Sequence, residues 1–474
     1  RSKLSTVGYG SWGRGGGTGF LGRINGKQIF DATFKDANRQ IRRNDIVAWN
    51  QGVNVGGGFG AVNPTPGQAF RTIGTTYNDN TGRGIVRRSH INSHNWFGLL
   101  SNFNHKLSDE LNFSVGIDAR YYYGYHPGAI TDFLGNNSYL ETADFNTRPT
   151  GTLITGSQAP TPSANPFAAA IKDKSQIASR NFDGEVLWYG GFGQLEYSKN
   201  DFTAFVQGAI SNQGFNRIDN WIVDGVTRQP AVTGPVVNRE TGFKNIIGYN
   251  FKGGANYNLN LNHNVFGNIG YISRQPFFNG VYPNNRQILN PNLTNEKIFS
   301  AELGYGYRSS NLKANVNLFR TSWKDRLQRR TGLTIPQPSG PAITQAYAEV
   351  NGIEQVHYGA EFDATYSIGR FVDIEAMFSW GDYRYQGDAE GTIYDDNNNP
   401  VILTSGTNVT KLNLDNVKVG DAAQMTASLG ATFKPVKGLR INANWRWVDQ
   451  LYSRFDVVAF DSSVQTATYT PPSL

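Results

Sequence analysis

The stretch LNFSVGIDARYYYGYH, from Leu111 to His126, decides the fold. Apolar or aromatic residues occupy every odd position from Leu111 to Tyr125, and small or polar residues occupy most even positions, with Tyr122 as the exception. Successive side chains of a β-strand point to opposite faces, so this alternation predicts one strand with an apolar and a polar face. At about 3.3 Å per residue it spans on the order of 50 Å, whereas an ordinary strand has about 5–6 residues.

The same period of two recurs along the chain, in segments 202–211, 312–318, 358–368, 372–380, 425–433 and 439–447. Short polar or glycine-containing breaks separate neighbouring segments and are typical of hairpin turns. They lie at 108–110, 200–201, 262–263, 309–311, 369–370 and 435–438. Between the hairpins run long stretches rich in Gly, Pro, Asn and Thr, at 13–87, 127–180, 216–242, 275–295, 330–345 and 386–420. With one leading strand near residues 1–11, this predicts about 13 antiparallel strands with short turns at one end and long loops at the other.

Long strands that are apolar on one face need an equally long apolar surface to cover them. A transmembrane β-barrel meets this need, because lipid contacts the outer face and the polar face encloses a lumen. We expect Val115, Ile117, Leu318 and Ile441 to contact acyl chains; their burial against a second layer of protein would contradict the barrel. Aromatic residues near the loop ends of the strands fit the membrane interface: Tyr121, Tyr123, Tyr125, Trp380, Tyr385, Trp445 and Trp447. Cross-strand aromatic pairs in a soluble sheet are the alternative for any single strand.

The composition narrows the classes further. Only 38% of the 474 residues are hydrophobic, and no run of 18 apolar residues exists, which excludes a transmembrane helix. Cysteine is absent, so disulfides and thiolate sites are excluded. The net charge of +7 comes from dispersed Lys and Arg, which does not favour nucleic acid as a partner. The chain opens at RSKLSTVGYG without an apolar signal segment, so we expect an internal start.

Several segments resemble the barrels of TonB-dependent outer-membrane receptors, most closely those of the Bacteroidetes type. NPNLTNEKIFSAELGYGYRSSNLKANVNLFRTSWKDRLQ, residues 290–328, is similar to a late-barrel signature of that family. NGIEQVHYGAEFDATYSIG, residues 351–369, resembles the next strand, and GLRINANWRWVDQLYSRF, residues 438–455, resembles the penultimate one. HNVFGNIGYISRQPFFNGVYPNN, residues 263–285, and residues 95–126 carry the Bacteroidetes-type similarity.

The resemblance implies a fold and a function. Residues 1–474 would form part of a receptor barrel, about 13 of an expected total of about 22 strands, without the plug domain and the final strand. The receptor would bind a scarce nutrient at the surface of a Gram-negative cell and import it, with energy from a TonB-type protein acting through the plug. A siderophore, another small molecule or an oligosaccharide would be the ligand, and a surface lipoprotein is a further possible partner. A passive outer-membrane porin and a β-rich surface adhesin are the alternatives.

Candidate contact residues follow from strand parity, which turns a set of charged side chains inward. They are Asp118, Arg120, Glu361, Asp363, Asp373, Glu375, Arg440 and Arg446. These residues either contact the plug or a ligand, or pair with each other and stiffen the wall. Loop aromatics either stack on a ligand or pack their own loops: Trp49, Phe133, Trp221, Phe277, Phe278 and Tyr282.

Three further motifs do not predict a site. The glycines of 8–19 lack the strand, helix and Lys-Ser/Thr of a phosphate-binding loop, so we expect a flexible loop. His90 and His94 share a strand face without a carboxylate partner, and the acidic run 395–399 lacks the Gly and Glu of a calcium loop. No triad or isolated carboxylate pair stands out. We therefore predict no enzyme, no cofactor and no resident metal.

Overall fold

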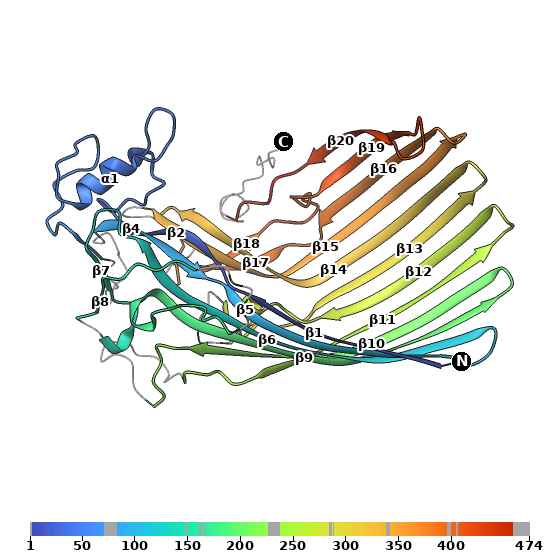
Figure 1. Ribbon diagram of the computed structural model, residues 1–474, viewed down its shortest axis with the longest axis horizontal. Helices are drawn as coiled ribbons and strands as arrows, with labels where there is room; N and C mark the ends of the chain where they lie inside the picture. Colours follow the sequence, from blue (N-terminus) through green and yellow to red (C-terminus); the bar gives the residue numbers. More distant parts are fainter. Residues whose placement is uncertain are drawn as a thin grey trace.

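The computed structural model describes residues 2–70, 83–147, 150–160, 163, 165, 167–225, 238–283, 287, 289–337, 342–395, 400–403 and 406–457. Its main element is a curved, open wall of long antiparallel strands (Figure 1). Thirteen long strands follow one another across it: β1 (Ser2–Gly13), β5 (Ser93–Lys106), β6 (Leu111–Asp132), β9 (Ile177–Lys199), β10 (Phe202–Asp219), β11 (Lys244–Asn258), β12 (His263–Arg274), β13 (Glu296–Arg308), β14 (Leu312–Ile335), β15 (Ile343–Ile368), β16 (Val372–Tyr385), β19 (Ala423–Phe433) and β20 (Ile441–Leu451).

The predicted hairpins are confirmed, because each short break joins two strands paired in simple antiparallel register. β5 and β6 meet across residues 107–110, for example, and β13 and β14 meet across 309–311. All the short turns lie at the right of Figure 1 and the long connections at the left. Within the described residues, β1 pairs only with β5 along its length and β20 only with β19, so these two strands are the edges of the wall.

The apolar faces of the strands remain uncovered. Val115 is 46% exposed, Ile117 57%, Leu318 52% and Ile441 54%, so no second protein layer packs on them. Strand register places all the other apolar positions of the period-two pattern on this same side of the wall, which we call the apolar face. Its glycines leave a furrow of about 560 Å³ between Ile210, Tyr249 and Phe251. A surface of this kind is stable in lipid and unstable in water.

The loop end of the wall contains ordered structure that the sequence did not predict. β2 (Gly16–Arg23) pairs with β4 (Gly84–Ile91), and β4 continues the ladder along the end of β6. The prediction of a flexible loop at residues 8–19 is therefore wrong, since only Arg14 and Gly15 interrupt β1 and β2. Gly22 has φ +84 and lies against the Gly84 carbonyl, a place that only glycine fits.

Small clusters fix the remaining loop segments. The α-helix α1 (Arg43–Asn50) and the 3-10 turn η1 (Ala32–Phe34) pack through Ile46, Trp49 and Phe34 onto Ile85 of β4. A three-stranded sheet of β3 (Gln68–Phe70), β7 (Ser138–Glu141) and β8 (Thr152–Ile154) packs on β4 and β6, near the 3-10 turns η2 (Phe145–Thr147) and η3 (Lys174–Gln176). β17 (Ala389–Tyr394) and β18 (Val409–Leu412) extend the loop end of β15 around a core with Tyr385 and Phe455. The short helix α2 (Phe278–Val281) packs on β10.

The helices among the described residues include no candidate for a membrane span. The structure describes the chain up to residue 457, and the final strand, which we expect after Leu474, lies outside the described residues.

Candidate functional site

The predicted inward-facing charges lie opposite the apolar face. Glu361 and Asp363 alternate along β15 with the outward residues Ala360 and Phe362, and the register continues this alternation into β14 and β16. Asp118, Arg120, Asp373, Glu375 and Arg446 occupy the same side, which we call the polar face. Arg440 is different, because β20 begins one residue later at Ile441 and leaves Arg440 exposed in the turn.

These charges do not converge on one site. Arg120 pairs with Asp118 two residues earlier in β6, and its guanidinium lies 4.6 Å from the Trp188 ring centre. Asp363 accepts a hydrogen bond of 2.9 Å from Asn315 of β14. Asp373 accepts one of 2.9 Å from Ser367 and pairs with Lys434. The described contacts are therefore with the wall itself, and the wider contact role of these residues stays a prediction.

Most of the loop aromatics pack their own loops. Trp49 is buried and donates from Nε1 to the Ala61 carbonyl at 3.0 Å. Tyr282 is buried beside Phe278, and its hydroxyl donates to the Phe215 carbonyl at 3.0 Å. Phe133 packs on the cluster around Ile130, and Trp221 is half-buried. Phe277, 70% exposed, remains available at the surface.

A group of cationic and aromatic side chains gathers on the polar face at the loop ends of β4, β6, β9 and β10. Phe182 stands opposite His126 in the register, and their rings stack 5.0 Å apart. The Arg180 and Arg217 guanidiniums lie 5.5 and 4.6 Å from the centre of the Phe182 ring. Arg88 and His90 occupy the same side on β4, opposite Ile130 and Gly128. We call Arg88, His90, His126, Arg180 and Phe182 the cationic cluster.

The arginines of this cluster lack carboxylate partners within the described residues. Arg180 donates to the Ile91 carbonyl at 2.7 Å and to Asn92 Oδ1 at 2.9 Å, but its Nε has no acceptor. The Nε of Arg88 is also unsatisfied. Arg217, only 3% exposed, is different: it pairs with Asp219 at 3.4 Å and with Gln287.

The pKa shifts of Arg180 and His90 agree with an excess of positive charge in the cationic cluster. Burial lowers the pKa of Arg180 to about 10, and the charge of Arg88 acts in the same direction. Burial also lowers the pKa of His90 to about 3, again helped by Arg180 and Arg88, so His90 is neutral at physiological pH. Its Nε2 lies 3.1 Å from Ser179 Oγ. Two like charges held close without an acid favour the binding of an anion between them.

One part of this cluster could be inferred from residue spacing in the sequence, and the rest could not. Arg88 and His90 are two residues apart in β4 and therefore share a strand face, whereas His94, predicted on the same face, belongs to the next strand, β5. Arg180 lies far along the chain and reaches them only because β6 pairs with both β4 and β9. His94 instead stacks on Tyr122 at 5.5 Å.

A pocket of about 200 Å³ lies elsewhere on the polar face. Unlike the cationic cluster, it contains acidic partners for its arginines. Glu296 pairs there with Arg274 and, at 2.8 Å, with Arg326. Across the described part of the chain, no group of three or more His, Asp or Glu could hold a metal ion. Of the acidic run 395–399, only Asp395 belongs to the described residues.

Comparison with known proteins gives one strong result. The family model for the TonB dependent receptor-like β-barrel matches residues 4–472. A search of curated protein sequences finds no match.

The solved structures that match the chain have low sequence identity to it and TM-scores below 0.5. The siderophore receptor PiuA from Acinetobacter baumannii is 12% identical with a TM-score of 0.46, and the match covers 78% of this chain and 48% of PiuA. The copper transporter OprC is 12% identical with a TM-score of 0.45, over 76% of this chain and 53% of OprC. The ferric citrate transporter FecA, in its unliganded form, is 12% identical with a TM-score of 0.44, over 77% and 44%. The chain thus spans about half the length of these proteins.

The assignment rests on the family model, which covers nearly the whole chain. The open wall of long antiparallel strands agrees with one part of such a barrel. The members of this family are outer-membrane transport receptors. The chain belongs to the TonB-dependent receptor-like β-barrel family.

Proposed function

We propose that this chain forms part of the wall of an outer-membrane receptor that imports a scarce nutrient with energy from a TonB-type protein. The family match over residues 4–472 carries the proposal. The uncovered apolar face supports it, because residues such as Ile117 and Leu318 have lipid as their only suitable neighbour. The coupling protein would act through a plug domain, as in the family, and binding and release would need no covalent chemistry.

The cationic cluster supports a ligand with an anionic group. Arg88 and Arg180 present guanidinium groups that no described acid neutralises, at the loop end where a ligand from outside arrives first. Arginine matches the planar oxygen pairs of carboxylates and phosphates, and its partners would be dehydrated beside Phe182. Anionic iron chelates and acidic oligosaccharides both satisfy this chemistry.

Growth tests of a deletion strain examine the proposal. We expect loss of growth on one class within a panel of iron sources and glycans, and uptake that stops when the TonB-type protein is deleted. A passive porin would continue to transport without that protein, and an adhesin would leave growth on every source unchanged.

Complementation then tests the cluster. We expect Arg180→Gln to raise the ligand concentration needed for half-maximal uptake by about tenfold or more, the effect of one charge-assisted contact. Arg87→Gln is the matched control, since Arg87 is on β4 beside Arg88 but on the other face. Equal effects of the two variants would show that the cluster does not contact the ligand.

A further inference from the structure

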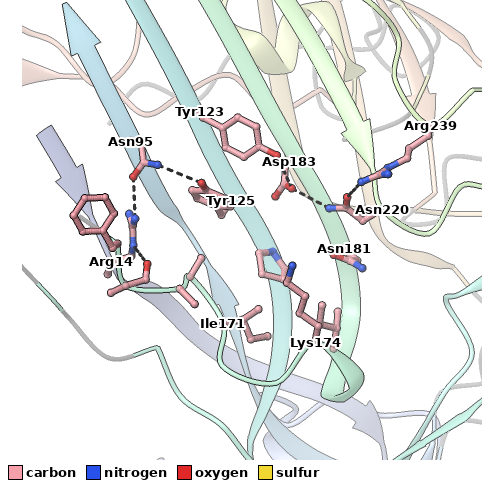
Figure 2. Close-up of a pocket in the computed structure, with 16 residues that line it drawn as sticks. Arg14, Asn95, Tyr123, Tyr125, Ile171, Lys174, Asn181, Asp183, Asn220 and Arg239 are labelled. Atoms are coloured by element: carbon pink, nitrogen blue, oxygen red, sulfur yellow. Dashed lines mark hydrogen bonds between the residues drawn. The ribbon is translucent and has the colours of Figure 1, made fainter. Parts of the chain in front are cut away.

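A cavity of about 710 Å³ lies at the loop end of the wall (Figure 2). The strand register places it on the side opposite the cationic cluster. Its floor contains Tyr123 and Tyr125 of β6 and Asp183 of β9. Tyr125 stands opposite Asp183 in the register, and both positions share the face of Val115 and Ile117 without an intervening bulge. The cavity therefore opens on the apolar, membrane-facing side of the wall and not on the polar side.

A loop segment covers this floor. Residues 167–171 and Lys174 form the roof, and Phe167 at its edge is 92% exposed. Arg14 joins the roof to the floor: its Nε donates to the Ala168 carbonyl at 2.8 Å, and an Nη donates to Asn95 Oδ1 at 2.9 Å. Asn95 in turn donates to the Tyr125 hydroxyl at 3.2 Å, as Figure 2 shows. The cavity is thus a built structure with fixed walls.

Positive charge exceeds negative charge around the cavity. Among the described residues that line it, Arg14, Lys174 and Arg239 are cationic and Asp183 alone is acidic. Asp183 is already engaged, because Tyr123 donates to it at 3.0 Å and Asn220 at 2.9 Å. Arg239 is held by Asn220 Oδ1 at 2.9 Å, whereas the Lys174 ammonium makes no hydrogen bond or ion pair within the described residues.

The height of the cavity along the strands, relative to the apolar and tyrosine positions of β6, indicates a class of ligand. On the same face the side chains change from Val115 and Ile117 to Tyr121, Tyr123 and Tyr125 towards the loops. Tyrosines of this kind mark the boundary between acyl chains and headgroups. An outward-facing cationic cavity at this height meets the headgroups of the outer leaflet, and the exposed Phe167 beside it suits an apolar tail. We propose that this cavity binds the phosphorylated headgroup of an outer-leaflet lipid.

Lipid binding to the purified full-length receptor tests this proposal. Native mass spectrometry in detergent would compare added diphosphorylated lipid A, the same lipid without its phosphates, and inorganic phosphate. We expect the phosphorylated lipid to bind at least about tenfold more tightly than the other two probes. Equal binding of the dephosphorylated lipid, or inorganic phosphate binding as tightly as the lipid, would overturn the proposal.

The double variant Lys174→Gln/Arg239→Gln should lose most of this preference. Lys172→Gln is the matched control, because Lys172 is exposed in the same loop segment but does not line the cavity. Unchanged binding by the double variant, or an equal loss in Lys172→Gln, would show that the cavity is not the site. Folding of each variant is checked by its heat-modifiable migration on gels, and an unfolded double variant is replaced by Lys174→Gln alone.

Discussion

Charge substitutions on neighbouring residues distinguish the two faces of the wall. Leu318 of β14 points to the apolar face and Asn317, the preceding residue, points to the polar face opposite Glu361. Leu318 lies six residues beyond the start of β14 at Leu312. At about 3.3 Å per residue and a tilt of about 40°, this is about 15 Å from the turn, near the middle of an apolar band about 25 Å tall.

The expected costs differ strongly because of this placement. An arginine on the lipid face near the midplane destabilises a barrel by about 2–4 kcal/mol. Leu318→Arg should therefore lower the free energy of unfolding by that amount. Asn317→Arg should change it by less than about 0.5 kcal/mol, since the new cation enters a polar surface beside Glu361.

Urea unfolding of the receptor in lipid vesicles measures both variants, with tryptophan fluorescence and gel migration as the two readouts. A larger loss in Asn317→Arg than in Leu318→Arg would refute the assignment of the faces. So would a neutral effect of Leu318→Arg, because it would mean that water surrounds this residue.

Three further outcomes follow from the loop end. Gly22→Ala should destabilise the β2–β4 pair by about 1–3 kcal/mol, because φ at Gly22 is +84 and an added Cβ would meet the Gly84 carbonyl. Limited proteolysis should detect this loss, whereas Gly17→Ala, whose added Cβ meets nothing within 4 Å, should leave the digestion unchanged. The pKa of His90 is about 3 in the folded state and 6.5 in the unfolded state. Between these two pH values the unfolded state binds more protons, so the free energy of unfolding falls as the pH drops below 6.5. Between about pH 7.5 and pH 5 the loss is at most about 2 kcal/mol, and His90→Gln should remove it from urea midpoints; an unchanged pH dependence would contradict the burial of His90. Tyr282→Phe should speed proteolysis near α2 by removing hydroxyl bonds to Phe215 and Thr241 worth about 1–3 kcal/mol, whereas Tyr249→Phe on the lipid face should not.

The strands and turns were predictable because their signals are local. A period of two assigns each residue of 111–125 to a face without knowledge of its neighbours, and a break such as 309–311 ends a strand through its own turn chemistry. The structure extends β6 to Asp132 and β14 to Ile335, beyond the ends that alternation marked. Those extensions pair with partners at the loop end, where lipid no longer requires an apolar face.

The glycine-rich start shows where local reading fails. Glycine carries no side chain to alternate, so the strand predicted near residues 1–11 and the loop predicted at 8–19 overlap. Residues 8–13 have no clear period of their own. They form a strand because β5 offers a complete row of partners, such as Leu99 opposite Gly8 and Phe97 opposite Gly10. The aromatic ring of Phe97 then covers the bare backbone at Gly10. Tertiary pairing, and not strand propensity, fixes this segment.

The two proposed binding regions were hidden for a related reason. Each assembles residues distant in the chain, as Arg88 meets Arg180 and Arg14 meets Ala168. No spacing in the sequence records these meetings, which depend on how loop segments fold onto the strand ends. The Bacteroidetes-type affinity, the plug and the lipoprotein partner stay predictions from resemblance.

Strand β9 connects the two regions and also keeps them apart. Arg180 and Phe182 face the cationic cluster, whereas Asn181 and Asp183, each one residue further along, line the outward cavity. Because alternate side chains of a strand point in opposite directions, the sheet itself separates the two surfaces. Ligand capture on one face and lipid binding on the other can therefore change independently by substitution.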